Sequence, residues 1–167
     1  MHFPSAILAL LASAAAVSAS SVTFWTLDDA KRTIYFTPNA GFPNIEPVTC
    51  DKSQKLKVNF PDKWIGNFYA VQKGQENKPG MLGEVNFNSW GGMTFFDVSA
   101  IVDPSDKNNV KQMWPASGPS PMSGCETFPC NNAYWLFDDV QTKVTHESDL
   151  ITTLGTGSTG IKFAELQ

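Results

Sequence analysis

Histidine and basic charge are scarce in this chain of 167 residues. It has two histidines, and 12 lysines and arginines stand against 16 aspartates and glutamates, so that the net charge is −4. Proteins that bind nucleic acids normally carry a basic excess to neutralise phosphates, so we expect no nucleic-acid partner. Zinc and copper sites with two histidines, and the HExxH motif, are excluded if only His146 remains in the mature protein. The sequence also lacks GxSxG and Walker motifs, and we expect no metal and no cofactor.

Cysteine is also sparse, with three residues in the chain. An odd number leaves at least one thiol without an intrachain partner. Cys125 and Cys130 frame a four-residue loop, and closing so short a loop loses little chain entropy, which favours their pairing with Cys50 unpaired. A bond from Cys50 across the fold is the alternative that the sequence leaves open. With one disulfide at most, the hydrophobic core must supply most of the stability.

Long hydrophobic runs are absent except at the start of the chain. Residues 1–19 contain an apolar run, no acidic residue, and the small residues Val17, Ser18 and Ala19 before a polar break. This pattern is typical of a secretory signal peptide. The apolar run of about 12 residues is shorter than the roughly 20 that cross a bilayer, so we expect cleavage after Ala19 and no membrane span. Secretion would allow the disulfide.

The rest of the chain alternates apolar and polar residues with a period of two, and no window shows a convincing helical face. Lys55 to Phe60 is one example, in which Leu56, Val58 and Phe60 alternate with polar residues. The pattern predicts strands at 22–27, 33–37, 55–60, 64–71, 81–87, 93–99, 109–114, 133–137, 141–145, 149–154 and 161–166, separated by turn signals. We therefore predict an all-β fold, a single antiparallel β-sandwich or flattened barrel of about ten strands. Residues 20–155 would form the domain, and 156–167 a C-terminal strand or a flexible tail.

Two carboxylates stand in the middle of predicted strands. Glu84 lies in Leu82-Gly-Glu-Val-Asn-Phe87, and Asp97 lies in Thr94-Phe-Phe-Asp-Val-Ser99. A charge flanked by apolar residues needs water or a partner, and adjacent antiparallel strands would bring both to one face. Paired carboxylates are the usual catalytic residues of glycoside hydrolases. Carboxylates are also common as solvated charges on the outer face of a sheet. From the residues alone, both interpretations remain open.

The central segment resembles a known family. Leu82-Gly-Glu-Val-Asn-Phe87, Trp90-Gly-Gly92 and Phe95-Phe-Asp-Val-Ser-Ala-Ile-Val-Asp103 look like the central motif of thaumatin-like proteins. Trp64-Ile-Gly-Asn-Phe-Tyr69 and Ala133-Tyr-Trp-Leu-Phe-Asp-Asp139 resemble two further segments of that family. The whole chain is similar to small secreted fungal proteins that induce a hypersensitive response in plants.

The resemblance implies an acidic cleft. The glutamate of that cleft would fall on Glu84, and its aspartates on Asp97, Asp103 and either Asp138 or Asp139. The arginine of the family has no counterpart, since Asn67 or Val71 occupies its place. The disulfide-rich insertion that forms one wall of the cleft in the family is much shorter in this chain. Trp90, beside two glycines, is the tryptophan that we expect to be most exposed.

Our leading hypothesis is therefore a secreted, non-enzymatic effector or elicitor of a fungal pathogen. It would act in the host apoplast as a monomer, be recognised by a plant cell-surface or apoplastic receptor, and trigger plant defence as a hypersensitive response. The alternative is a β-glucan-binding or weakly glucan-hydrolysing thaumatin-like protein that uses the acidic cleft. A shallow cleft without its arginine favours the first hypothesis.

Overall fold

Strands make up nearly all of the regular structure. The computed structural model describes residues 20–162; residues 1–19, where we expect the signal peptide, and 163–167 lie outside the described part. The strands are β1 (Ser20–Thr26), β2 (Arg32–Pro38), β3 (Val48–Cys50), β4 (Leu56–Phe60), β5 (Ile65–Gln72), β6 (Leu82–Asn86), β7 (Thr94–Ser99), β8 (Val110–Pro115), β9 (Ser123–Gly124), β10 (Lys143–Thr145) and β11 (Asp149–Leu154). One short 3-10 turn, η1 (Trp90–Gly92), joins β6 to β7. The predicted all-β class is confirmed, and no helix within 20–162 is long and apolar enough to span a membrane.

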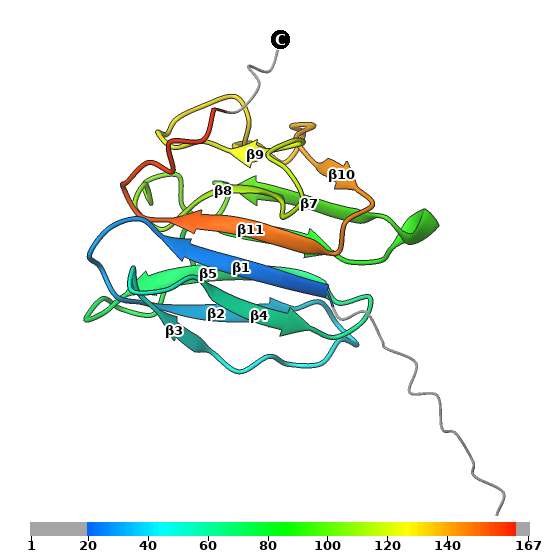
Figure 1. Cartoon of the computed structure of the whole chain (residues 1–167), viewed down its shortest axis with the longest axis horizontal. Helices are drawn as coiled ribbons and strands as arrows, with labels where there is room; N and C mark the ends of the chain where they lie inside the picture. Colours follow the sequence, from blue (N-terminus) through cyan, green and yellow to red (C-terminus); the bar gives the residue numbers. More distant parts are fainter. Residues whose placement is uncertain (1–19, 163–167) are drawn as a thin grey trace, which may run out of the picture.

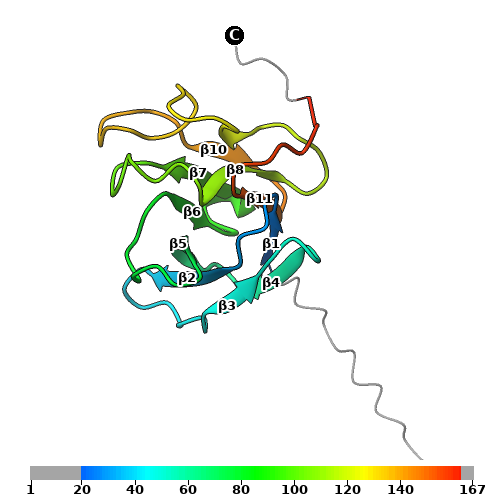
Figure 2. The same cartoon turned by 90° about the vertical axis from the view of Figure 1, so that its left-hand side faces the viewer.

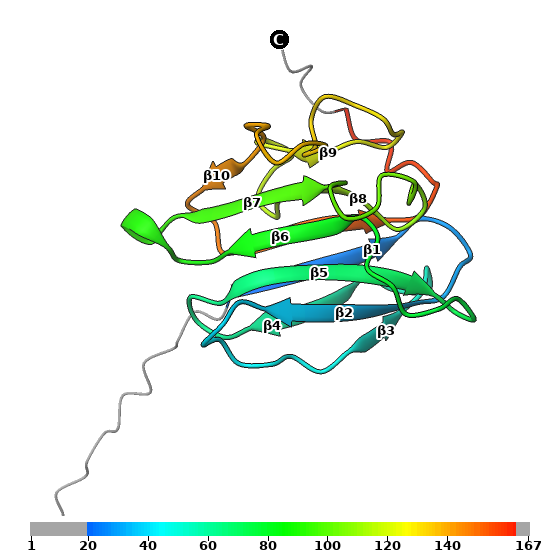
Figure 3. The ribbon, with the colours of Figure 1, turned by 180° about the vertical axis from the view of Figure 1, so that it is seen from behind.

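The strands form two sheets that pack face to face. The five-stranded sheet has the order β4-β1-β11-β8-β9 and lies in front in Figure 1. The six-stranded sheet has the order β10-β7-β6-β5-β2-β3 and lies in front when the molecule is seen from behind (Figure 3). Figure 2, turned by 90°, shows β1 and β4 on one side of the molecule and β2, β5 and β6 on the other. The predicted sandwich is therefore present, with eleven strands in the described residues.

One pairing corrects the expectation of a purely antiparallel fold. β1 and β11 run parallel, with six residue pairs from Ser21–Asp149 to Thr26–Leu154. Parallel neighbours need a long connection between them, and here that connection is almost the whole domain. The pairing joins the first and last strands at the centre of the five-stranded sheet.

Alternating burial explains why these segments form strands. In β4, Val58 and Phe60 are buried while Lys57 and Asn59 are exposed. Successive side chains of a strand point to opposite faces, so the apolar set faces the other sheet and the polar set faces water. The period-two pattern of the sequence therefore sets which face of each strand lies in the core.

Aromatic side chains fill the space between the sheets. Phe24 and Phe68 contact edge to face with ring centres 5.0 Å apart, and Phe60 contacts Trp64 at 5.1 Å. Trp64 is fully buried, and its Nε1 donates a hydrogen bond of 2.9 Å to the carbonyl of Pro43. Edge-to-face contacts of this kind stabilise a core beyond the apolar area that they bury.

Two predicted strands are not present as such. Residues 133–137 form a loop with a single bridge between Tyr134 and Ser99. Of the apolar side chains that suggested a strand there, Ala133 is buried and Trp135 packs against the core, whereas Leu136 is 61% and Phe137 90% exposed. Of the predicted strand at 161–166, Ile161 and Lys162 lie in no strand and the remainder lies outside the described residues. The short strands β3 and β9 were not predicted, because two or three residues are too few for a periodic pattern.

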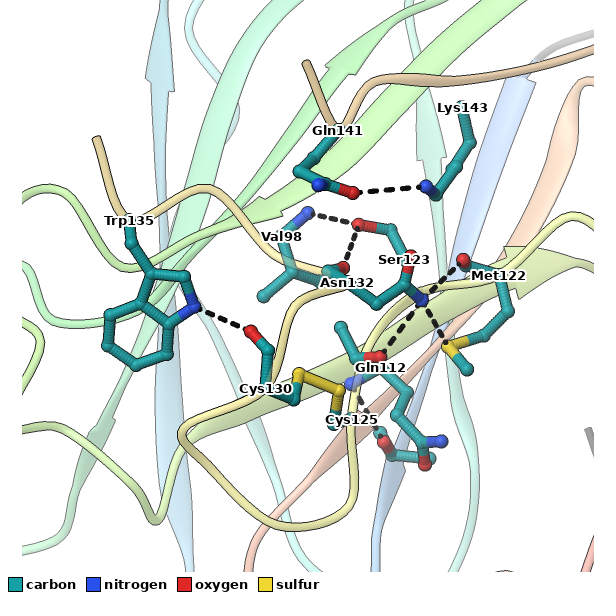
Figure 4. The surroundings of a disulfide bond; sticks show 12 residues. Val98, Gln112, Met122, Ser123, Cys125, Cys130, Asn132, Trp135, Gln141 and Lys143 are labelled. Carbon is teal, nitrogen blue, oxygen red and sulfur yellow. Dashed lines mark hydrogen bonds between the residues drawn. A yellow bond between two sulfur atoms is a disulfide. The ribbon is translucent and has the colours of Figure 1, made fainter. Parts of the chain in front are cut away.

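The disulfide joins Cys125 to Cys130, with Cα atoms 6.5 Å apart, and Cys50 is a buried free thiol. Figure 4 shows how the surrounding loop is held. Trp135 Nε1 donates to the carbonyl of Cys130 at 2.7 Å, and Asn132 Nδ2 donates to the carbonyl of Met122 at 2.8 Å. These bonds anchor the disulfide loop and the start of the 133–142 loop beside β8 and β9.

Candidate functional site

A row of polar side chains crosses the outer face of the six-stranded sheet. The strand register pairs Thr37 with Asn67, Asn67 with Glu84, and Glu84 with Asp97, across β2, β5, β6 and β7. Residues directly opposite one another in a sheet present their side chains to the same face. Thr142, just before β10, extends the row by donating from Oγ1 to Asp97 Oδ2 at 3.3 Å. The two predicted carboxylates are therefore direct cross-strand neighbours.

An open groove of about 450 Å³ lies over this row. Its floor comes from β5, β6 and β7, and its walls come from the loops that follow β2 and β7 and from the 133–142 loop. The lining residues are Asn39, Ile65, Gly66, Asn67, Glu84, Val85, Asn86, Phe95, Asp97, Ile101, Tyr134, Phe137 and Thr142. The groove therefore combines a polar, acidic floor with apolar and aromatic walls.

The carboxyl of Asp97 is strongly perturbed. Its residue is 8% exposed, and burial, followed by the neighbouring charge of Glu84, raises the pKa of Asp97 to about 8. The hydroxyl of Thr142 and the charge of Lys143 act in the opposite direction. A buried carboxyl next to a second carboxylate ionises with difficulty, because both effects disfavour its charged form. At neutral pH the pair therefore retains one proton.

Hydrogen-bond acceptors on the groove floor lack donors. Asp97 Oδ1 and Asn86 Oδ1 are buried and have no hydrogen-bond partner. Within residues 20–162, no lysine, arginine or histidine forms an ion pair with Glu84 or Asp97. The only arginine of the sequence, Arg32, is buried in a different ion pair with Asp28. The acidic pair thus has no ion-paired cation within residues 20–162, although the charge of Lys143 acts on Asp97. Asn67, one of the two positions at which the resemblance would place an arginine, stands beside Glu84 on β5.

The remaining acidic candidates, Asp103 and either Asp138 or Asp139, do not line the groove. Asp103 lies in the loop after β7, where its Oδ1 accepts hydrogen bonds from the backbone and hydroxyl of Ser105, and it lines a separate hollow. Asp139 Oδ2 accepts from the backbone N–H groups of Trp135 and Leu136 at 2.7 and 2.9 Å. Asp138 is exposed and does not line the groove. Short polar side chains of this kind commonly stabilise their own turns.

Trp90 is 79% exposed, as its glycine-rich context predicts. It lies on η1, at the tip of the β6–β7 hairpin, and does not line the groove. The carboxylate pair lies in the middle of the same hairpin. Trp90 is therefore an exposed surface aromatic, separate from the candidate site.

Sequence reasoning did not identify Asn86, Phe95, Ile101, Tyr134, Phe137, Asn39 and Thr142 as groove residues. The first two lie two positions from Glu84 and Asp97, so strand alternation was a sufficient signal for them. The others come from loops, whose placement over the sheet no periodic pattern reports. Within the described part of the chain, no three His, Cys, Asp or Glu side chains gather where a metal ion would bind.

Comparison with known proteins finds similarity both in sequence and in structure. No family model matches the chain. The antigenic protein SchS21 of Stachybotrys chartarum is 61% identical over 144 residues, which make up 86% of this chain and the full length of that protein. The crystal structure of the protein elicitor MoHrip2 from Magnaporthe oryzae superposes with a TM-score of 0.65 at 13% identity. The superposed region covers 82% of this chain and 99% of the MoHrip2 chain. At this identity, the likeness shows a shared fold.

Proposed function

The chain belongs to the same family as the antigenic protein SchS21, and on that premise we propose that it is a secreted, non-enzymatic elicitor. It would trigger plant defence, as a hypersensitive response, through a receptor at the plant cell surface or in the apoplast. The shared fold with the protein elicitor MoHrip2 supports an elicitor-like role. The relatives in sequence and structure come from the fungi Stachybotrys chartarum and Magnaporthe oryzae, which supports a fungal source.

The observation that carries the proposal is a set of exposed apolar side chains on two of the loops that wall the groove, the loop after β7 and the 133–142 loop. We call Ile101, Leu136, Phe137 and Val140 the apolar rim; their exposed fractions are 45, 61, 90 and 90%. Three of them come from one loop, and Ile101 and Phe137 also line the groove. Grouped exposed apolar side chains mark sites of contact with other molecules. Contact with a receptor through the apolar rim would explain why these four apolar side chains are exposed to solvent rather than packed in the core.

Secretion is part of the proposal. We propose that residues 1–19 are a signal peptide and that residues 20–155 form the mature domain. The start of β1 at Ser20 and the Cys125–Cys130 disulfide support this division, since disulfides persist in oxidising compartments. Edman sequencing of protein from a culture medium should begin at Ser20.

We also propose that the domain is a reduced form of the thaumatin-like architecture. The position of Glu84 and Asp97 on adjacent strands supports it, together with the two-sheet sandwich. The alternative function for such a domain is the binding or hydrolysis of a β-glucan in the acidic groove.

A leaf-infiltration experiment separates the two functions. Purified protein is infiltrated into leaves and ion leakage is measured, while the same preparation is assayed for hydrolysis and pull-down of laminarin. We expect cell death without release of sugar, and loss of cell death in Phe137→Ser but not in Trp90→Ser. The second variant is a matched control, because it removes an exposed aromatic side chain away from the groove. Sugar release that disappears in Glu84→Gln would make the protein a glucanase and overturn the proposal.

A further inference from the structure

Two buried hydrogen-bond acceptors on the groove floor have no partner in the described part of the chain. Tyr134 Oη and Thr142 Oγ1 lie 2.8 Å apart, and Thr142 Oγ1 donates to Asp97 Oδ2. Because the Thr142 proton is used for Asp97, Tyr134 must be the donor to Thr142. The Tyr134 proton is therefore committed to Thr142 Oγ1, and the Thr142 proton is committed to Asp97 Oδ2. Asp97 Oδ1, on a residue more than nine-tenths buried, and Asn86 Oδ1 receive no donor from another side chain or backbone group in residues 20–162, and the one proton retained at neutral pH lies between Asp97 and Glu84.

This deficit indicates what a ligand must bring. Buried acceptors without partners are costly, so a ligand that supplies N–H or O–H donors there gains more than it would on an ordinary surface. The floor also carries negative charge from Glu84, with no cation paired to it in residues 20–162. A neutral hydroxyl group supplies donors but leaves the charge uncompensated. A cationic group with several N–H donors meets both requirements.

The walls suit the stem that carries such a cation. Phe95, Tyr134 and Phe137 line the groove with Ile101 above the acidic floor. Lysine and arginine side chains lay their methylene stems on apolar surface while their charged ends reach polar groups. Aromatic faces next to a cation add further attraction. The apolar rim beyond the groove would contact the residues that flank the cation.

We propose that this groove binds a lysine or arginine side chain of a partner polypeptide, with Glu84 and Asp97 receiving the charged end and Phe95, Tyr134 and Phe137 holding its stem. The inference rests on the proposed function only in taking the partner to be a host protein. Binding itself is a property of the groove. The carboxylate pair would then act in recognition of a cation, and no catalytic step is required of it.

Proton release accompanies binding in this scheme. Groups facing Asp97 are Glu84 from β6, Lys143 from β10 and Tyr134 and Thr142 from the 133–142 loop. A cation at the floor favours the ionised pair, so the proton that Asp97 retains at neutral pH leaves when the ligand enters. The measured binding enthalpy should therefore depend on the ionisation enthalpy of the buffer.

The test uses the mature protein and defined peptides. A capped pentapeptide with a central lysine flanked by leucines is titrated against ¹⁵N-labelled protein at pH 7, in parallel with the same peptide carrying arginine, acetyl-lysine or norleucine. Butylamine and laminarihexaose are the non-peptide probes. We expect saturable shifts at the amides of Glu84 and Asp97 with the lysine and arginine peptides, and at least tenfold weaker binding of acetyl-lysine, norleucine and butylamine.

Three variants locate the interaction. Glu84→Gln removes the charge and should weaken the binding of the lysine peptide at least tenfold. Phe137→Ser should also weaken the binding of this peptide, because it removes part of the groove wall. Glu147→Gln removes an exposed carboxylate of the β10–β11 turn and should leave the affinity unchanged. Circular dichroism and the melting temperature of each variant confirm that it is folded. Equal binding of the acetyl-lysine peptide, tight binding of butylamine alone, competition by laminarihexaose, or unchanged affinity in Glu84→Gln would each overturn the inference.

Failure of this inference is distinguishable from failure of the proposed function. If the peptides do not bind but the wild-type protein still kills leaf cells, the ligand class is wrong and the elicitor function stands. If the peptides bind as expected and infiltration causes no cell death, the groove is a cation site and the elicitor function falls.

Discussion

Arg32 and Asp28 form a bidentate ion pair in which Nη1 and Nη2 of the buried guanidinium donate to the two carboxylate oxygens at 2.6 and 2.9 Å. Nε donates to Asn109 Oδ1, and the two remaining N–H groups donate to the carbonyls of Ala30 and Asn108. All five donors of the guanidinium are therefore used. The pair connects the β1–β2 turn to the residues that precede β8.

Removing the guanidinium should be strongly destabilising. Arg32→Met leaves Asp28 and two backbone carbonyls without their partner, and breaking a buried ion pair in this way costs about 3–5 kcal/mol of the free energy of unfolding. Urea unfolding monitored by tryptophan fluorescence measures the loss. Lys31→Met, at the exposed neighbouring residue, is the control and should change stability little. A loss of similar size in both variants would contradict this role.

The same pair makes stability sensitive to acid. Burial alone would raise the pKa of Asp28, but hydrogen bonds from Arg32, Thr156 and Ala30 and the charge of Arg32 outweigh it and lower the pKa to about 2. A lowered pKa contributes stability that is present above about pH 4 and is lost as the pH falls towards 2. In Asp28→Asn, we expect lower stability at pH 6 and a smaller further loss between pH 4 and pH 2. If the free energy of unfolding of the wild type and of Asp28→Asn falls by the same amount between pH 4 and pH 2, this prediction is wrong.

Asp97 should act in the opposite sense. Between about pH 4 and pH 8 the folded protein retains a proton on Asp97 that the unfolded chain releases, so stability falls as the pH rises. Asp97→Asn removes this titration and should raise the free energy of unfolding at pH 8 by at least about 1 kcal/mol, with little gain at pH 4. Urea unfolding at both pH values measures the change. Asp138→Asn, at an exposed carboxyl, is the control, and a variant that is less stable at pH 8 would refute the prediction.

Gly83 leaves room for a core ring directly beneath the acidic pair. A Cβ atom at this position would lie 2.3 Å from Cζ of Phe68, so Gly83→Ala forces the ring or the strand to move. Such overpacking typically costs 1–3 kcal/mol, and we expect a loss of about 2 kcal/mol in urea unfolding. Phe68→Leu in the Gly83→Ala background should recover part of this loss, which a double-mutant cycle detects. Gly118→Ala is the control, because its Cβ would contact nothing within 4 Å.

The disulfide should contribute a modest part of the stability. Closing the loop between Cys125 and Cys130 is worth about 2 kcal/mol by the chain-entropy relation for a ring of this size. We expect this loss in Cys125→Ala/Cys130→Ala and in the wild type under reducing conditions, measured by urea unfolding. Burial raises the pKa of the Cys50 thiol, so a thiol reagent should modify it only after unfolding. Rapid labelling of Cys50 in the folded protein would contradict its buried position.

Local patterns of the sequence determined much of this molecule. Alternation in segments such as 55–60 predicted strands and their buried faces, and the spacing of Cys125 and Cys130 favoured the disulfide that the structure contains. Glu84 and Asp97 were identified because each interrupts an apolar strand. These features depend on a few neighbouring residues, and the steric and polar preferences of such short segments act locally.

Only the tertiary structure decided which distant segments meet. The parallel pairing of β1 with β11 and the approach of the 133–142 loop to the floor of β6 and β7 join residues far apart in the chain. Asp103 and Asp139 illustrate the same limit, because local turns use their carboxylates and keep them out of the groove. Strand alternation specifies a face but not the neighbour across it, since pairing depends on the packing of the whole core. For this reason the acidic pair was visible in the sequence, whereas the groove that surrounds it was not.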